Sequence, residues 1–288
     1  MGVPPRFEGV AILVCAVEAL SQPTYIGFGA FKEAYRAVDE NGVPFAVKIF
    51  DPAKCDVARA EREIDSMGRC KSPFIGKFYR SGGINDKGVV YLYVIEEYFD
   101  GGTLKDRMVP GSVLSKRCVM GYGKCLLQAV AHLKELLLVH RDIKPENIMF
   151  RDGEASAILV DFGLVRDLSG ESLTLSFIAH GPGTPFFASP EQLNNDKHLI
   201  DWRSDQFSIG VVLGICLCGV HPYQEISDNS GAVVAKVMKR KGCSLFFRSK
   251  AEPDVFRLVE KMTAPWPISR FGDPASIVHF CEEIEKGC

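Results

Sequence analysis

The stretch His140-Arg141-Asp142-Ile143-Lys144-Pro145-Glu146-Asn147 decides most of what this sequence predicts. It places an aspartate, a lysine and an asparagine within eight residues, and a second aspartate lies 19 residues after Asp142, in Asp161-Phe162-Gly163. A carboxylate can accept a hydroxyl proton, and further oxygen ligands can bind a metal ion. The pattern therefore predicts a site that holds a metal-bound nucleoside triphosphate and deprotonates a hydroxyl beside its terminal phosphate.

Each polar residue of the two motifs has a candidate role. Asp142 is the candidate catalytic base, and Lys144 would balance charge on the phosphoryl group in transfer. Asn147 and Asp161 offer the oxygen ligands that magnesium prefers, with manganese as an alternative ion. A polar loop with a turn-forming Asp-Phe-Gly is the simpler alternative, but both motifs at this spacing make chance a poor explanation.

The composition is that of an ordinary globular protein. The 288 residues, 47% hydrophobic and 24% charged, suffice for one large domain or for two lobes that share a cleft. A formal net charge of −2 gives no reason to expect nucleic acid as a partner. The ten cysteines show neither zinc-binding nor scaffold spacing, which favours a reducing, cytoplasmic compartment.

An apolar run at residues 10–17 is too short to span a bilayer, which takes about 20 residues. Glu8 and Glu18 flank the run, and the pattern of a signal peptide is missing. We therefore expect no membrane span, but a strand or a helix packed on the domain.

Strand signals dominate the first hundred residues and helical periodicity dominates the rest. We expect three short strands within 24–50, broken by glycines and the Asn41-Gly42 turn, a strand at 88–98, and helices at 56–69, 119–138 and 207–218. Asp100-Gly101-Gly102 breaks the pattern and is the candidate hinge. A cleft between the two parts is the expected ligand site.

Two features of the strand-rich part fit the same chemistry. Gly27-Phe28-Gly29 lies between strand-like stretches, where glycines let backbone amides approach phosphate oxygens, although plain hairpins also contain this pattern. Lys48 ends an apolar strand, and the helix expected after it offers Glu61 or Glu63 as a partner.

We expect Glu63 to be that partner, because Ile64 and Met67 supply the apolar spacing beside it. A Lys48–Glu63 ion pair would aim the ammonium at the α- and β-phosphates. A surface helix whose acids only face water is the alternative, and it leaves Lys48 unexplained.

Together these motifs resemble those of the eukaryotic-type protein kinases over about residues 20–285. The resemblance implies an α+β, two-lobed fold with a small antiparallel β-rich N-lobe, a larger mainly α-helical C-lobe and an ATP cleft between them. It implies an N-terminal extension at 1–20, the N-lobe at 21–98, and the hinge and C-lobe at 99–288. Lys32 stands where the family has a third glycine, and Ala34 replaces the following valine.

The resemblance also implies a set of ATP-binding residues in the glycine loop, the adjacent strands, the hinge and the C-lobe. These residues are Gly27, Phe28, Gly29, Ala34, Ala46, Lys48, Glu97, Phe99 and Met149. With Glu97-Tyr98-Phe99 as the hinge, Glu96 takes the gatekeeper position behind the adenine pocket, which is usually apolar or a threonine. A carboxylate there must be hydrated, paired or shifted in pKa, unless the alignment slips by one residue.

More distant residues extend the resemblance. Residues 183–191 resemble the end of an activation segment, with Ser189 in place of the usual alanine, and Arg270 matches the arginine that pairs with Glu191. Asp205 resembles the buried aspartate that anchors the catalytic loop. The stacked apolar spine would comprise His140, Phe162, Met67 and Phe78.

The later residues favour a protein substrate, because small-molecule kinases of the aminoglycoside type share the catalytic loop but lack this segment. Lys144 and Thr184 resemble serine/threonine rather than tyrosine specificity. Arg141, beside the base, implies a regulatory phosphate on the activation segment, with Thr174 and Ser176 as expected autophosphorylation sites and Thr184 as a further regulatory residue.

We therefore expect a protein serine/threonine kinase that uses ATP and magnesium. The alternative from another class is a pseudokinase that binds nucleotide or serves as a scaffold. Lys32 and Glu96 support that alternative, whereas the intact catalytic and metal-binding residues argue against it. A kinase that phosphorylates a small molecule is the third hypothesis.

Overall fold

The computed structural model describes residues 4–29, 31–55, 57–168 and 184–287. The contacts within the chain divide it into two compact units. Unit 1 comprises Met1–Lys71 and Gly76–Phe99, and unit 2 comprises Ser72–Ile75 and Asp100–Cys288.

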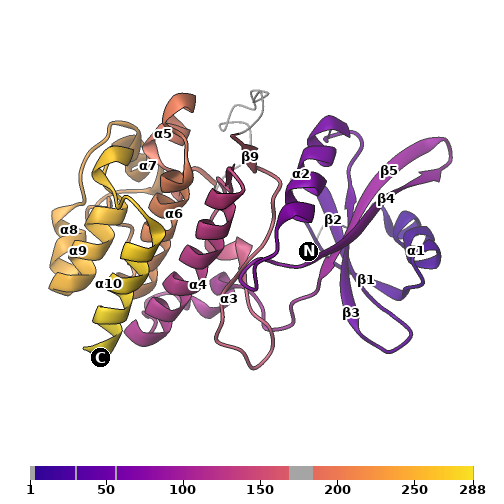
Figure 1. The fold of residues 1–288 in the computed structure, drawn as a ribbon, viewed down its shortest axis with the longest axis horizontal. Helices are drawn as coiled ribbons and strands as arrows, with labels where there is room; N and C mark the ends of the chain where they lie inside the picture. The colour runs from indigo at the N-terminus through magenta and orange to yellow at the C-terminus, as the bar shows by residue number, and fades with distance from the viewer. Residues whose placement is uncertain (1–3, 30, 56, 169–183, 288) are drawn as a thin grey trace. The chain divides into compact units, whose positions relative to one another are not determined.

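Unit 1 contains an antiparallel sheet whose strands follow the order β1-β2-β3-β5-β4 (Figure 1). The strands are β1 (Ser21–Phe28), β2 (Lys32–Val38), β3 (Pro44–Phe50), β4 (Phe78–Asp86) and β5 (Val89–Glu97). The predicted Asn41-Gly42 turn joins β2 to β3. Gly42 adopts a left-handed φ of +79°, and the Asp39 carboxylate stabilises the turn by accepting hydrogen bonds from the Asn41 and Val43 N–H groups. The strands expected within 24–50 and at 88–98 are confirmed.

One face of this sheet packs against helix α1 (Glu8–Val17), so the apolar run near the N-terminus is a packed helix. The residues of α1 that are buried recur at helical spacing, and alternate residues of β2, β3 and β5 meet them. This core contains Val10, Ala11, Val14, Tyr35, Val47, Ile49, Tyr93 and Ile95.

Polar contacts fix the chain on both sides of α1. The Arg6 guanidinium lies 3.0 Å from Glu33 and 2.9 Å from Asp51. The Glu18 carboxylate forms an ion pair with Arg80 on β4 and accepts a hydrogen bond from the Tyr93 hydroxyl on β5. The helix is therefore held to the sheet by both apolar packing and ion pairs.

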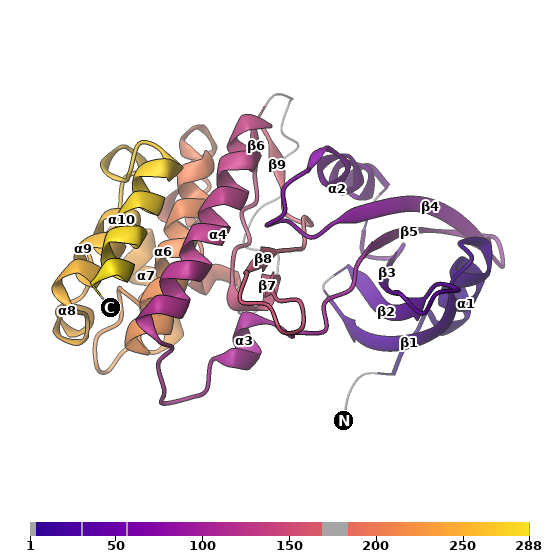
Figure 2. The ribbon, with the colours of Figure 1, turned by 60° about the horizontal axis from the view of Figure 1, so that its bottom comes forward.

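The face of the sheet opposite to α1 carries charged side chains. Strand register places Lys32, Ala34, Ala46, Lys48 and Glu96 on it, since these residues lie opposite one another or two positions apart. Helix α2 (Val57–Arg69) confirms the helix predicted at 56–69, and it contacts this face through an ion pair between Glu63 and Lys32. Figures 1 and 2 show α1 and α2 on different sides of the sheet.

Unit 2 is mainly helical. Helices α4 (Lys116–Glu135) and α6 (Trp202–Cys218) confirm the predicted helices at 119–138 and 207–218. α6 is buried along most of its length and packs against α4 and α9 (Pro253–Met262), while α10 (Pro274–Lys286) packs against α4. The shorter helices are α3 (Leu104–Arg107), α5 (Pro190–Leu193), α7 (Ser230–Met238) and α8 (Leu245–Lys250).

The sequence of elements confirms the predicted α+β fold, with an antiparallel sheet in the first part and helices in the second. Within the described residues, no helix combines the length and the apolar character needed to cross a membrane.

Candidate active site

The catalytic loop, residues 140–147, follows strand β6 (Leu138–Val139) and ends in the 3₁₀ turn Pro145–Asn147. The Asp205 carboxylate on α6 accepts hydrogen bonds from the backbone N–H groups of His140 and Arg141, each at 2.8 Å. Burial raises the pKa of Asp205 to about 7. Arg141 adopts a left-handed φ of +68°, which these two bonds help to hold. The predicted anchoring of the loop by Asp205 is confirmed.

Asp142 is the centre of a hydrogen-bonded cluster within this loop. Its Oδ2 accepts hydrogen bonds from Lys144 Nζ at 2.8 Å and from Asn147 Nδ2 at 3.0 Å. The same Nδ2 donates to the Asp142 carbonyl at 2.9 Å. Burial raises the pKa of Asp142 to about 6, and the charge of Lys144 opposes this shift. A carboxylate with such a pKa is suited to accept a proton at neutral pH.

A short hairpin brings the two sequence motifs together. Strands β7 (Ile148–Met149) and β8 (Ile158–Leu159) pair antiparallel, and the Val160 N–H donates to the Asn147 carbonyl at 3.0 Å. Asn147 precedes β7 and Asp161 follows β8, so both lie at the same end of the hairpin. Asp161 has a φ of +68°, and its Oδ1 accepts a hydrogen bond from the Gly163 N–H at 3.2 Å.

The ring of His140 contacts that of Phe162 at a centroid distance of 5.2 Å, edge to face. Burial lowers the pKa of His140 to about 4, so the imidazole is neutral and packs as an aromatic ring. Two predicted spine residues of unit 2 are therefore in contact. Met67 and Phe78 belong to unit 1, and the four-residue spine remains a prediction.

The end of the predicted activation segment is tied down by a buried ion pair. Arg270 Nη1 and Nη2 donate to the two Glu191 carboxylate oxygens at 2.7 and 3.0 Å, and both side chains are fully buried. The Ser204 hydroxyl donates a further hydrogen bond to Glu191 at 2.8 Å. The predicted Glu191–Arg270 pair is confirmed.

Gln192 has a role that sequence reasoning missed. Its Oε1 accepts hydrogen bonds from the backbone and hydroxyl of Ser189, the residue that replaces the usual alanine and caps α5. Its Nε2 donates to the Arg141 carbonyl at 2.8 Å and so connects the segment to the catalytic loop. The Ser-Pro-Glu-Gln spacing is that of a capping box and was the available signal.

In unit 1, Gly27-Phe28-Gly29 lies at the end of β1. Gly27 pairs with Ala34 of β2, and the Gly29 N–H donates to the Lys32 carbonyl at 2.7 Å, which closes the turn between the strands. Phe28 is exposed. Ala34 shares the charged sheet face with Ala46 and Lys48, so three of the predicted ATP-binding side chains lie together.

The structure corrects the predicted Lys48–Glu63 ion pair. The Lys48 ammonium bonds to Glu96, and Glu63 bonds to Lys32 instead. Lys48 lies opposite Val94, so Glu96, two residues further on the same face, is its diagonal neighbour. Of the three states expected for Glu96, the structure has the paired one.

The predicted hinge residues adjoin the boundary between the units. The Glu97 N–H donates to the Lys77 carbonyl at 2.8 Å, and Phe99 is buried. In unit 2, Gly101 and Phe150 are hydrogen-bonded at 3.0 Å, and a side chain at Gly101 would clash with the Phe150 carbonyl. Met149 forms a β-bridge with Thr103 nearby. The roles of Glu97, Phe99 and Met149 in ATP binding remain predictions.

The predicted phosphorylation sites Thr174 and Ser176 lie outside the described residues, as does the side chain of Thr184. Arg141, the predicted reader of a phosphate, donates from its Nε to the Leu164 carbonyl at 2.7 Å. These regulatory roles remain predictions.

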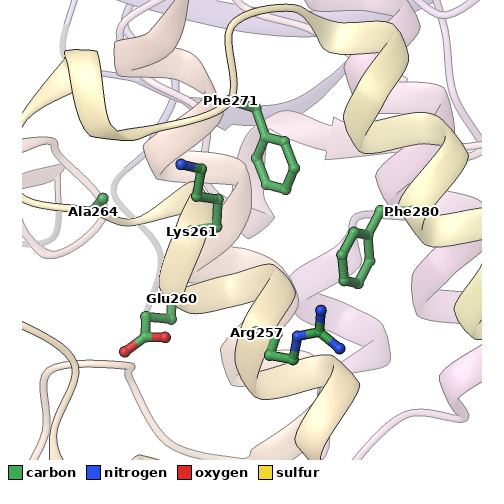
Figure 3. Close-up of a pocket in the computed structure, with 6 residues that line it drawn as sticks. All are labelled: Arg257, Glu260, Lys261, Ala264, Phe271 and Phe280. Atoms are coloured by element: carbon green, nitrogen blue, oxygen red, sulfur yellow. The ribbon is translucent and has the colours of Figure 1, made fainter.

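Unit 2 contains a cavity of about 460 Å³, lined by residues of α9, of α10 and of the segment between them (Figure 3). Arg257 and Lys261 lie beside the rings of Phe271 and Phe280 in its lining. The described lining residues include none from the catalytic loop or the hairpin, so this cavity is distinct from the candidate active site.

Comparison with known proteins assigns the family. The protein kinase domain model matches residues 20–281. A probable myosin light chain kinase of Dictyostelium discoideum is 31% identical over 203 residues, which are 69% of this chain and 62% of that protein. A probable serine/threonine-protein kinase of Streptomyces coelicolor is 30% identical over 255 residues, or 85% of this chain and 37% of the relative.

Serine/threonine-protein kinase PknD of Mycobacterium tuberculosis is 29% identical over 262 residues, 88% of this chain and 38% of the relative. The matched part thus spans between 37% and 62% of the length of these three relatives. With its family match over residues 20–281, its Asp142–Lys144 cluster and its Glu191–Arg270 pair, the chain belongs to the protein kinase family.

Proposed function

We propose that this chain is a protein serine/threonine kinase that transfers the γ-phosphate of ATP to hydroxyl groups of proteins. The observation that carries the proposal is the cluster around Asp142, a largely buried carboxylate with a raised pKa that is held by Lys144 and Asn147. Groups with this combination of burial and charged partners concentrate at catalytic sites.

In this proposal Asp142 accepts the proton of the substrate hydroxyl as the phosphoryl group is transferred. Lys144 keeps Asp142 ionised and balances negative charge on the phosphoryl oxygens. Lys48 binds the phosphates of ATP, and the backbone of residues 27–29 lies against them. Asp205 keeps the loop in place through its two backbone hydrogen bonds.

The residues at the end of the β7–β8 hairpin fit a magnesium or manganese ion. The Asn147 Nδ2 is used by Asp142, and in the described part of the chain its Oδ1 makes no hydrogen bond. Oδ1 and the Asp161 carboxylate are the hard oxygen ligands that these ions take. A bound ion would neutralise charge on the triphosphate.

The preference for protein serine and threonine residues is supported by the names of the relatives and by Lys144 and Thr184. A cavity of about 490 Å³ adjoins the end of the activation segment and suits a peptide. Its described lining residues are Glu146, Pro185, Phe186, Phe187, Ser230, Gly231 and Val234.

We also propose a cytoplasmic location and autophosphorylation at Thr174 or Ser176. The nine cysteines of the described residues are free thiols, as a reducing compartment would keep them. Mass spectrometry after incubation with ATP and magnesium tests the second point. A peptide map without phosphate between Asp161 and Glu191 would contradict it.

A radiolabel transfer assay tests the proposed activity. We compare the wild-type chain with Asp142→Asn, and Asp152→Asn serves as a matched control at an exposed position near the loop. Transfer to protein should fall by ~10³-fold or more in Asp142→Asn, because positioning and electrostatics supply most of the rate in such sites. Asp152→Asn should match the wild type.

Two outcomes would assign another function. A wild-type chain that binds ATP but transfers nothing to protein is a pseudokinase, the alternative that the intact Asp142 cluster disfavours. Transfer to a soluble metabolite with none to protein would identify a small-molecule kinase.

A further inference from the structure

Four charged side chains of unit 1 form two ion pairs. Lys32 on β2 bonds to Glu63 on α2, and Lys48 on β3 bonds to Glu96 on β5. The second pair is set by the sheet itself, because Lys48 lies opposite Val94, two residues before Glu96. The two side chains are diagonal neighbours on hydrogen-bonded strands and meet without any movement of a helix.

Burial makes Glu96 dependent on Lys48. Glu96 is only 8% exposed; its Oε2 bonds to Lys48, and its Oε1 is buried without a hydrogen-bond partner among the described residues. A buried carboxylate that lacks a nearby cation is strongly disfavoured. If the Lys48 ammonium left Glu96 and paired with Glu63, the Glu96 carboxylate would be buried without a cation. The observed Lys48–Glu96 pairing is therefore the more stable one.

The Lys32–Glu63 pair strengthens this argument. Both side chains are largely buried, and the Glu63 carboxylate is already engaged by the Lys32 ammonium. Exchanging partners would disrupt two buried ion pairs at once, and breaking either is costly.

We propose that Glu96, and not Glu63, is the carboxylate that positions Lys48 for phosphate binding in this kinase. The inference rests on the proposed function, in which Lys48 contacts the phosphates of ATP. Lys48 carries three N–H donors, so it can keep its bond to Glu96 and direct another donor to a phosphate oxygen. Its orientation then depends on β3 and β5 rather than on α2.

The test compares Glu96→Gln with Glu63→Gln. Glu61→Gln is the matched control, because Glu61 lies on the same helix as Glu63 and is exposed. For each variant, ATP, ADP and adenosine are titrated by calorimetry, and kcat and KM for ATP are measured in the transfer assay. Adenosine reports general damage to the site, since it has no phosphates for Lys48 to contact.

Glu96→Gln should lower the preference for ATP over adenosine about tenfold or more, the effect of losing a charged hydrogen bond. It should lower kcat/KM by ~10²-fold, the effect of a misplaced catalytic group. Glu63→Gln should retain more of the ATP preference than Glu96→Gln does, and Glu61→Gln should retain all of it. Glu96→Asp, which keeps the charge, should recover part of the loss.

An unchanged or increased ATP preference in Glu96→Gln would overturn the proposal. An increase would mean that Glu96 merely competes with phosphate for Lys48, because removing its negative charge strengthens the attraction. Equal losses in Glu96→Gln and Glu96→Asp would also overturn a positioning role. If Glu96→Gln does not fold, Glu96→Leu replaces it, because it also removes the charge and leaves no polar group to bury. A smaller loss in this variant than in Glu63→Gln contradicts the inference.

The titrations separate this inference from the proposed activity. A wild-type chain that prefers ATP to adenosine but transfers no phosphate refutes the kinase activity alone. The comparison of Glu96 with Glu63 is then decided by the binding data.

Discussion

The catalytic loop of unit 2 and the charged sheet face of unit 1 hold their lysines in different ways. In the loop, Lys144 and Asn147 bind Asp142 from two and five residues away. On the sheet, Lys48 meets Glu96 across 48 positions of sequence. The loop cluster is fixed by local chain geometry, whereas the sheet pair depends on strand register and on which carboxylate each ammonium reaches.

The surroundings of the two regions differ as well. The loop is connected to α6 through Asp205 and to the activation segment through Gln192, and the segment is connected in turn to Arg270. Among the described residues, the sheet face carries the Lys32–Glu63 and Lys48–Glu96 ion pairs. A lost contact in unit 2 should therefore affect distant elements, whereas a lost contact in unit 1 should change local pairing.

The largest expected effect is on the buried ion pair of unit 2. Glu191→Gln leaves the fully buried Arg270 charge without its carboxylate, so the free energy of unfolding should fall by about 3–5 kcal/mol. Urea unfolding measures this change. Asp254→Asn, which breaks the exposed pair with Arg257, is the control and should be nearly neutral. Equal stability of the two variants would show that the buried pair of unit 2 contributes no more than an exposed one.

Next in size is the effect of Asp205→Asn on the catalytic loop. An amide has one acceptor oxygen, so it cannot bind both the His140 and the Arg141 N–H groups in the way that the carboxylate does. We expect kcat/KM to fall by ~10²-fold through misplacement of Asp142. Steady-state kinetics, with the melting temperature as a control for folding, give the answer. If Asp205→Asn has the kinetics of the wild type, the catalytic loop keeps its conformation without the Asp205 carboxylate.

The smallest effect is the pH dependence of transfer. Asp142 has a pKa of about 6 and must be ionised to accept a proton, so kcat/KM should fall by about tenfold per unit below that pH. The charge and hydrogen bond of Lys144 lower this pKa, and Lys144→Met should therefore move the acid limb to higher pH. If the acid limb lies at the same pH in the wild type and in Lys144→Met, it reports the ionisation of a group other than Asp142.

The sequence allowed the local features of both regions to be predicted, because they depend on neighbours. The Asn41-Gly42 turn, helix α2 and the placement of Asp142 and Lys144 in one loop follow from spacing and residue type. Spacing left open whether the apolar run, which forms α1, is a strand or a helix. Glu191–Arg270 and Asp205 were accessible through the family resemblance, because each residue stands at the position that matches the family's motif. The Ser-Pro-Glu-Gln spacing contained the signal for Gln192, which went unused.

The partner of Lys48 could not be obtained in this way. Apolar spacing on α2 selected Glu63, and this criterion shows which helix face is buried but not which cation that face meets. The choice depends on the register of β3 against β5, which places Glu96 diagonally across from Lys48. It also depends on Lys32, whose position at the start of β2 brings it to Glu63.

Helix α1 has a practical consequence for recombinant production. It lies before residue 20, where the match to the family begins, yet it covers the apolar face that includes Tyr35, Val47 and Tyr93. An expression clone trimmed to the family boundary would expose this surface and release the Arg6 and Glu18 ion pairs. Such a fragment should aggregate in the test tube, so cloning should retain the residues from Arg6 onward.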